Sequence, residues 1–201
     1  MDYAAATPVR NEILALMAPY WSAEFANPGS VHKEGVLAES ALREARERVA
    51  HMLRVRPRDV LFTSGGTESN NLALCGVVAS LNAEGVRNED IEIISTRIEH
   101  PSILKTLEHL EHEGVKVLYA PVGGEGLVLE KEFEALLSPK TKLVTCAYAN
   151  SEIGVVEPIK HLSRMVKAHR SEQRSSYPYM HVDASQAPLW LPLALDSLGV
   201  D

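Results

Sequence analysis

Apolar residues recur along the chain with two different periods, and the two kinds of segment alternate. Residues 36–53 carry apolar side chains at every third or fourth position with Glu and Arg between them, which predicts an amphipathic helix. Short runs rich in aliphatic residues are typical of buried strands. They occur at residues 59–63, 91–95, 115–120, 142–147 and 179–182. Further helices are expected at about 68–81, from Pro101 to Gly114, at 130–137 and at 158–169.

This alternation predicts the fold class. A β-α-β order favours a mostly parallel sheet that helices cover on both faces, so we expect an α/β domain. Residues 123–126 predict a turn, and residues 170–178 predict a polar loop. Residues 195–201 have the pattern of a helix end leading into one more strand. We therefore expect a domain that is incomplete at its C-terminus.

The first 35 residues differ from the remainder. Prolines and glycines interrupt them repeatedly, which is unfavourable for a layer of a core. We expect residues 1–35 to form an N-terminal arm that wraps a neighbouring element, and residues 36–201 to form the large ligand-binding domain.

Composition and charge exclude several classes of protein. Hydrophobic residues make up 45% and charged residues 23% of the 201 residues, which is typical of a globular chain. The net charge of −7 disfavours nucleic acid as a partner. No apolar run approaches the roughly 18 residues needed to span a bilayer, and the N-terminus lacks the pattern of a signal peptide. We expect neither a membrane nor a nucleic-acid partner.

The two cysteines, Cys75 and Cys146, each lie within an apolar run. They cannot form a disulfide framework, and neither has a second ligand at the spacing of a metal site. We expect both to be small core residues, no bound metal, and a cytoplasmic protein.

A glycine turn with the character of a phosphate site follows residues 59–63. Gly66 lets the backbone approach an anion, and Thr67 adds a hydroxyl at the start of the next helix, where free N–H groups attract negative charge. The turn lacks the Gly-Lys-Ser/Thr of a P-loop. An ordinary turn with a Thr cap is the alternative.

Polar residues also follow the other predicted strands. His100 comes after residues 91–95, with an exposed loop histidine as the alternative. Asn150 and Ser151 follow residues 142–147, where a cap or turn is equally compatible. Asp183 and Gln186 follow residues 179–182. A carboxylate at a buried strand end needs a cationic partner or a structural capping role.

Together these groups fit one ligand class. Carboxyl ends of parallel strands meet at one edge of a sheet, where ligands bind. A phosphate cradle, an aromatic ring, an amide and a carboxylate at that edge are what pyridoxal 5'-phosphate requires, because the carboxylate keeps the pyridine nitrogen protonated. A nicotinamide dinucleotide would need a GxGxxG turn, which is missing.

At this point the chain resembles the cysteine desulfurases of the class V aminotransferase group, over essentially its whole length. The group has the fold type I pyridoxal-phosphate architecture. The resemblance depends on six segments in the same order, namely Asp2-Tyr3-Ala4-Ala5 with Thr7-Pro8-Val9, Asn27-Pro28-Gly29-Ser30-Val31-His32, residues 62–70 (FTSGGTESN), Glu99-His100, Glu152-Ile153-Gly154-Val155-Val156, and residues 181–186 (HVDASQ).

The resemblance implies roles for single residues. Gly66 and Thr67 would bind the cofactor phosphate. His100 would stack on the pyridine ring and exchange protons, Asp183 would pair with the ring nitrogen, and Gln186 would bind the phenolic oxygen. Ser151 stands where the family has a second asparagine that contacts the cofactor, so either Ser151 or Asn150 would make this contact.

The resemblance also implies an activity. Family members take sulfur from L-cysteine, leave alanine and form an enzyme persulfide for sulfur transfer and iron–sulfur cluster assembly. A homodimer and a sulfur acceptor or iron–sulfur scaffold protein would be the partners. The cofactor-binding lysine and the nucleophilic cysteine of the family would lie beyond Asp201, and neither Cys75 nor Cys146 matches the latter. We therefore expect the 201 residues alone to be inactive.

Two other interpretations remain open at this stage. A selenocysteine lyase, an aminotransferase or an epimerase of the same group would share residues 1–201 almost unchanged. A truncated, non-catalytic protein that retains the fold would also carry the phosphate cradle without the lysine.

Overall fold

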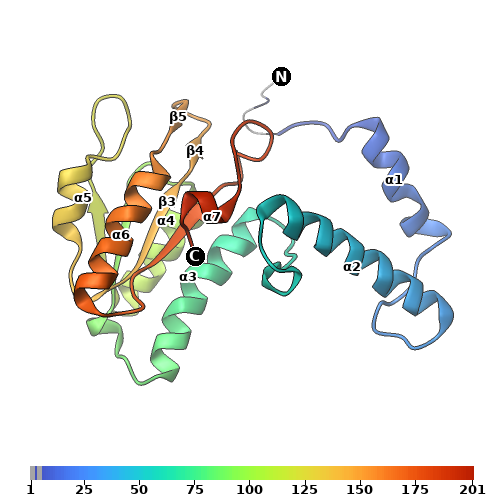
Figure 1. Cartoon of the computed structure of the whole chain (residues 1–201), viewed down its shortest axis with the longest axis horizontal. Helices are drawn as coiled ribbons and strands as arrows, with labels where there is room; N and C mark the ends of the chain where they lie inside the picture. The colour runs from blue at the N-terminus through green and yellow to red at the C-terminus, as the bar shows by residue number, and fades with distance from the viewer. Residues whose placement is uncertain (1–2, 4–5) are drawn as a thin grey trace. The chain divides into compact units, whose positions relative to one another are not determined.

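The computed structural model describes Tyr3 and residues 6–201, grouped into two compact units (Figure 1). The first unit ends at Leu61, and the second covers Phe62–Asp201. Asp2, Ala4 and Ala5 of the N-terminal motif lie outside the described residues. The predicted wrapping of residues 1–35 around a neighbouring element stays a prediction.

The first unit contains two helices and a 3₁₀ turn, which are α1 (Asn11–Ser22), α2 (Lys33–Leu53) and η1 (Pro57–Asp59). The sequence pattern does not predict α1, because a proline is typical of an interruption and Pro19 lies inside this helix. None of the side chains of α1 is buried. In the part of the chain that the structure describes, no helix combines the length and apolar character that crossing a membrane requires.

The predicted helix at 36–53 is confirmed and begins three residues earlier. His32 caps its N-terminus, because the Nδ1 atom accepts a hydrogen bond from Gly35 N at 3.2 Å. Gly35 has no room for a side chain, since a Cβ atom would lie 2.3 Å from the Ser30 carbonyl oxygen. Arg54 ends the helix in the left-handed conformation, with φ of 57°.

The predicted strand at 59–63 is wrong. Asp59 belongs to η1, and residues 60–63 have no regular secondary structure. Leu61 is 68% exposed. An apolar run becomes a strand only where its backbone groups meet those of another strand. The sheet of the described residues does not include this segment, so the glycine turn follows an irregular stretch.

The second unit is built around one sheet. Its elements are α3 (Gly66–Ala83), η2 (Asn88–Asp90), β1 (Glu92–Thr96), α4 (Pro101–His112), β2 (Lys116–Ala120), α5 (Glu130–Leu136), β3 (Thr141–Ala147), β4 (Ala149–Asn150), β5 (Val155–Val156), α6 (Ile159–Gln173), β6 (Tyr179–Asp183) and α7 (Leu195–Leu198). The strand order is β2-β1-β3-β6, and all three pairs are parallel. The α/β fold with a parallel sheet is confirmed.

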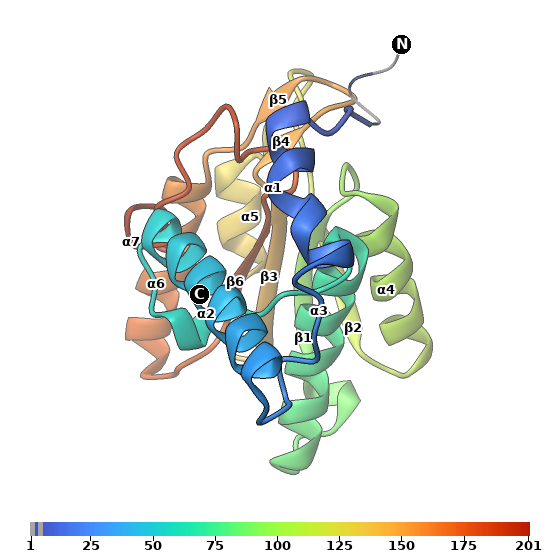
Figure 2. The ribbon, with the colours of Figure 1, turned by 90° about the vertical axis from the view of Figure 1, so that its right-hand side faces the viewer.

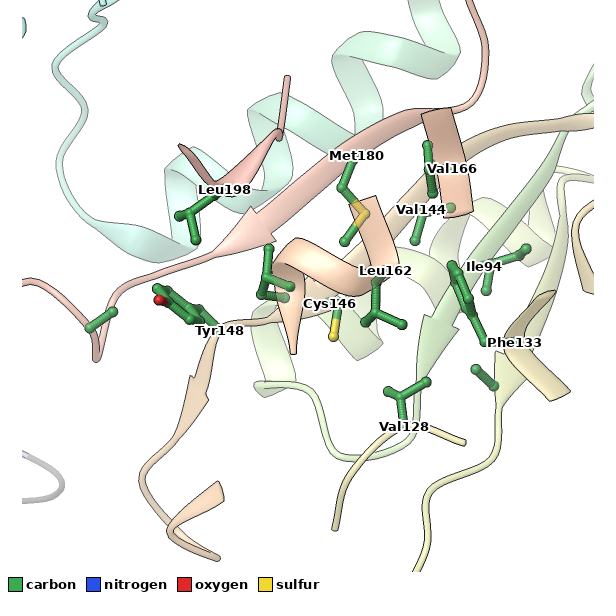
Figure 3. Packing of buried hydrophobic residues seen from close by; sticks show 13 residues of the cluster. Ile94, Val128, Phe133, Val144, Cys146, Tyr148, Leu162, Val166, Met180 and Leu198 are labelled. Carbon is green, nitrogen blue, oxygen red and sulfur yellow. The ribbon is translucent and has the colours of Figure 1, made fainter. Parts of the chain in front are cut away.

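Helices cover both faces of this sheet, because successive strand residues point to opposite sides. Ile93 packs with apolar residues of α3 and α4, whereas Ile94 packs with those of α5, α6 and α7. Leu143 and Val144 of β3 divide between the two cores in the same way. Figure 2 shows the strands between α4 and α6, and Figure 3 shows the core that contains Ile94 and Val144.

The predicted loop at 170–178 is shorter than expected, because α6 continues to Gln173. Arg174 ends the helix with φ of 51°. The polar residues 170–173 lie on the helix, where Arg170 Nε donates to the Pro178 carbonyl oxygen at 2.6 Å and the guanidinium pairs with Asp201. The polar composition of residues 170–173 predicts a loop, but these residues form the last turn of α6.

The ends of two other segments agree with the sequence pattern. Gly114 follows α4 with φ of 95°, a conformation that favours glycine and stops the helix. Residues 195–201 contain α7, and beyond it Asp201 N donates to the Met180 carbonyl oxygen at 3.1 Å. The chain at this point runs beside β6.

The strand order also locates a crevice. The chain crosses from β1 to β2 on one side and from β3 to β6 on the other, so the direction of winding reverses between β1 and β3. In open parallel sheets, the carboxyl ends of the strands at such a point form a ligand-binding crevice.

Candidate functional site

A cavity of about 270 Å³ lies at this edge of the sheet. The size is close to the lower end of the range for small-molecule sites, about 300 Å³. All seven predicted site residues line it: Gly66, Thr67, His100, Asn150, Ser151, Asp183 and Gln186. The structure therefore brings together residues from four separate segments.

The first turn of α3 forms one wall. Gly65 occupies the N-cap position, and because glycine has no side chain this position supplies no cap to the backbone N–H groups of the turn. Thr67 lines the cavity, and Asn71 Nδ2 donates to its backbone carbonyl oxygen at 2.8 Å. A Cβ atom on Gly66 would lie 2.8 Å from Ser185 Oγ, so the glycine lets the helix approach the segment after β6. This wall suits an anion.

Asp183 ends β6 and contributes a charge. Ser185 N donates to its Oδ1 atom at 2.9 Å, and Asn70 Nδ2 donates to its Oδ2 atom at 2.8 Å. Partial burial by itself raises the pKa of Asp183, but these hydrogen bonds and the nearby His181 outweigh it and hold the pKa below its ordinary value. The carboxylate is ionised and available to a cationic group.

His100 precedes α4 and caps it. Ser102 N donates to His100 Nδ1 at 3.1 Å, and Ser102 Oγ lies 2.7 Å from the same nitrogen. Pro101 occupies the first helical position, where its missing N–H costs nothing. The capping contacts hold the imidazole ring at the cavity.

Asn150 ends β4, and Ser151 begins the turn between β4 and β5, which form a small antiparallel ribbon. Asn150 Nδ2 donates to the Ile98 carbonyl oxygen at 2.7 Å, and its Oδ1 atom accepts from Glu152 N at 2.9 Å and Ile153 N at 3.2 Å. The amide oxygen thus holds the turn, and the amide nitrogen joins it to the segment after β1. Ser151 is exposed beside it at the cavity wall.

Glu99 is a cavity residue to which the sequence analysis assigned no role. It is 5% exposed. Its Oε1 atom accepts from Thr96 Oγ1 at 2.6 Å and from Ala147 N at 3.1 Å, which joins the ends of β1 and β3. Its Oε2 atom is buried without a hydrogen-bond partner among the described residues. Burial, with smaller effects from Asp183 and Glu157, raises the pKa of Glu99 to about 7.

Asn70 and Ser102 also line the cavity and also had no assigned role. For both residues, the spacing to a predicted site residue indicates a place near the site. Asn70 lies four residues after Gly66, which places the two on one face of α3. Ser102 is two residues after His100, within the capping distance of a helix start.

The cysteines take no part in the cavity. Cys146 is buried in β3 within the core shown in Figure 3, and burial raises the pKa of its thiol. Cys75 is half-buried on α3, and burial raises its pKa as well. The packing of Cys146 confirms the predicted core role. Over residues 6–201, no cluster of three or more His, Cys, Asp or Glu side chains is arranged to hold a metal.

Known proteins show clear similarity to this chain. The sequence model of the family described as “Aminotransferase class-V” matches residues 1–201. The chain is 38% identical over 201 residues to a “Cysteine desulfurase IscS” from Dictyoglomus turgidum, covering 100% of this chain and 48% of that protein. It is 37% identical over 202 residues to a “Cysteine desulfurase” from Homo sapiens, of which it covers 42%. The chain spans about half the length of the curated relatives it matches.

Solved structures give the same result. A structure titled “NIFS-LIKE PROTEIN” superposes with a TM-score of 0.91 at 36% identity, covering 100% of this chain and 52% of that one. Another, titled “SspA in complex with cysteine”, superposes with a TM-score of 0.88 at 34% identity, covering 100% and 54%. The predicted architecture is shared with these proteins over its full length.

Proposed function

Because the chain belongs to the aminotransferase class-V family, among the cysteine desulfurases, we propose that it forms the cofactor-binding part of a desulfurase. The reaction would take sulfur from L-cysteine, leaving alanine and a persulfide on the enzyme. One observation carries this proposal. An ionised carboxylate, Asp183, lies in the same cavity as the uncapped N-terminus of α3.

The residues of the cavity fit pyridoxal 5'-phosphate. The first turn of α3, with Gly66 and Thr67, would hold the phosphate. Asp183 would hold the protonated ring nitrogen, His100 would lie against the ring, and Gln186 would bind the phenolic oxygen. When bound, the cofactor supplies an electron sink for negative charge that develops on the substrate. The ionised Asp183 would stabilise the cationic ring that this role requires.

The hydrogen bonds of Asn150 decide which residue near the turn between β4 and β5 would contact the cofactor. The Asn150 amide oxygen accepts from the backbone of this turn at Glu152 and Ile153, and the amide nitrogen donates to the Ile98 carbonyl oxygen after β1. Ser151 has a hydroxyl at the cavity wall, so we assign the contact with the cofactor to Ser151 rather than to Asn150. A homodimer and a sulfur-acceptor or iron–sulfur scaffold protein are the partners proposed with this activity.

The activity is tested on the full-length gene product with added pyridoxal 5'-phosphate. L-cysteine should give alanine and, with a thiol reductant, sulfide in equal amounts. L-selenocysteine, and L-alanine with an oxo acid, serve as the alternative substrates. Transamination without sulfide, or turnover of selenocysteine alone, would refute the desulfurase assignment.

Thr67 provides a test of the phosphate wall. Changing Thr67 to Val keeps the shape and removes the hydroxyl, so the affinity for pyridoxal 5'-phosphate should fall by about tenfold, the usual loss for a hydrogen bond to a charged group. Fluorescence titration of the purified chain measures this. Pyridoxal, which has no phosphate, is the matched control ligand, and an equal loss of its affinity would contradict a phosphate contact.

A further inference from the structure

Two buried side chains join His100 to Asp183 by hydrogen bonds. Asn70 Nδ2 lies 2.8 Å from Asp183 Oδ2 and 2.9 Å from Ser102 Oγ. Ser102 Oγ lies 2.7 Å from His100 Nδ1. Asn70 is 4% exposed and Ser102 is 8% exposed, so water competes little for these bonds. The four residues form one continuous chain, which we call the Asn70–Ser102 bridge.

The direction of each hydrogen bond follows from two groups at the ends of the bridge, one that can only donate and one that can only accept. The backbone N–H of Ser102 can only donate, so His100 Nδ1 is an acceptor and carries no hydrogen. The Ser102 hydroxyl therefore also donates to Nδ1, and its oxygen accepts from Asn70. The second hydrogen of the Asn70 amide goes to Asp183, whose ionised carboxylate can only accept.

We propose that Asn70 and Ser102 are positioning residues that hold the neutral His100 ring in the tautomer with its hydrogen on Nε2. A rotated Asn70 amide would place its oxygen against the Asp183 carboxylate. A hydrogen on His100 Nδ1 would face two donors from Ser102. The bridge therefore specifies one arrangement. The role of the bridge in catalysis rests on the proposed function, but its hydrogen bonds form without a ligand.

This tautomer limits what His100 can do. In the neutral ring, Nε2 carries a hydrogen and has no lone pair, so it donates a hydrogen bond but removes no proton at that atom. His100 would thus donate from Nε2 to an anionic oxygen or sulfur of a ligand in the cavity.

Nitrogen NMR of the purified chain without cofactor tests the tautomer directly. The chain is labelled with ¹⁵N-histidine and studied at pH 8.5, where free imidazole is neutral. A His100→Gln variant identifies the signals of this ring. We expect an unprotonated Nδ1 and a protonated Nε2 for His100. A protonated Nδ1 in the unmodified chain would overturn the proposal, whether or not any variant folds.

Variants of Ser102 test the cause. Ser102→Ala should lower the ratio of the Nε2-protonated to the Nδ1-protonated tautomer of His100 by about fivefold, the effect of one ordinary hydrogen bond. Ser102→Thr retains a hydroxyl and should retain the ratio. Ser163→Ala is the matched control, because Ser163 is 2% exposed and its hydroxyl donates to the Leu198 carbonyl oxygen, away from the bridge. An unchanged ratio in Ser102→Ala would contradict the proposal.

Kinetics of the full-length gene product separate this inference from the proposed function. Ser102→Ala should lower kcat severalfold with little change in KM, and Ser102→Thr should restore kcat. If the gene product shows no desulfurase activity while His100 keeps the Nε2 hydrogen, the proposed function fails and the bridge stands. If activity is present and the tautomer is the other one, the bridge fails alone.

Discussion

Replacing Asp183 by alanine is expected to lower the rate of alanine formation from L-cysteine by about 100- to 1,000-fold, the usual loss when one preorganised charged or donor group is removed from a reaction site. Asp183 is the group that would keep the cofactor ring cationic. Its hydrogen bonds from Ser185 and Asn70 hold it ionised and fixed in place. The measurement is steady-state turnover of the full-length gene product at saturating cofactor.

Two further variants separate charge from shape. Asp183→Asn keeps the size of the side chain and removes the charge, so it should be nearly as slow as Asp183→Ala. Asp196→Asn removes an exposed carboxylate on α7 and should leave the rate unchanged. Circular dichroism checks that each variant is folded. An Asp183→Asn variant that is as fast as the unmodified protein would contradict the assigned role.

Replacing Glu99 by glutamine is expected to stabilise the protein at high pH by on the order of 3 kcal/mol, with little effect near pH 4. The pKa of Glu99 is raised from 4.5 to about 7 in the folded chain. Its proton therefore contributes stability that is fully present below pH 4.5 and is lost as the pH rises through 7. Glutamine is neutral at every pH and avoids this loss.

Urea unfolding at pH 5 and pH 8.5 measures the effect as the difference between the Glu99→Gln variant and the unmodified chain. The matched control is Glu68→Gln. Hydrogen bonds from Ser64 lower the pKa of Glu68, so this change should bring no gain at pH 8.5. A stability difference for Glu99→Gln that stays constant between the two pH values would rule out a neutral Glu99 in the folded state.

Local patterns were sufficient where the physical cause is local. The parallel sheet and its covering helices follow from hydrophobic periodicity, because each strand or helix needs an apolar surface of a particular spacing. Gly114 shows the same on a smaller scale, since a left-handed helix end favours glycine wherever it occurs. His100, Asn150, Ser151, Asp183 and Gln186 follow strands of the sheet, whose carboxyl ends all lie at the same edge. Gly66 and Thr67 follow an irregular stretch, and the glycine turn at a helix start is the pattern that predicts them.

Local patterns failed where another segment decides the outcome. Residues 60–63 are apolar enough for a strand but are not part of the sheet. Residues 170–173 look like a loop, yet Arg170 anchors that turn of α6 to Pro178 and Asp201. Helix α1 is a different case, because Pro19 inside it is typical of an interruption.

The amino-acid sequence by itself determined the α/β class, the parallel sheet and the set of polar residues at one edge, since these depend on the order and spacing of residue types. Only the tertiary structure decided the raised pKa of Glu99 and the direction of the Asn70–Ser102 bridge. A pKa depends on burial and on charges from other segments, and a hydrogen bond depends on distance. Asn70 and Asp183 meet at 2.8 Å across 113 positions of the chain, and no local pattern encodes that contact.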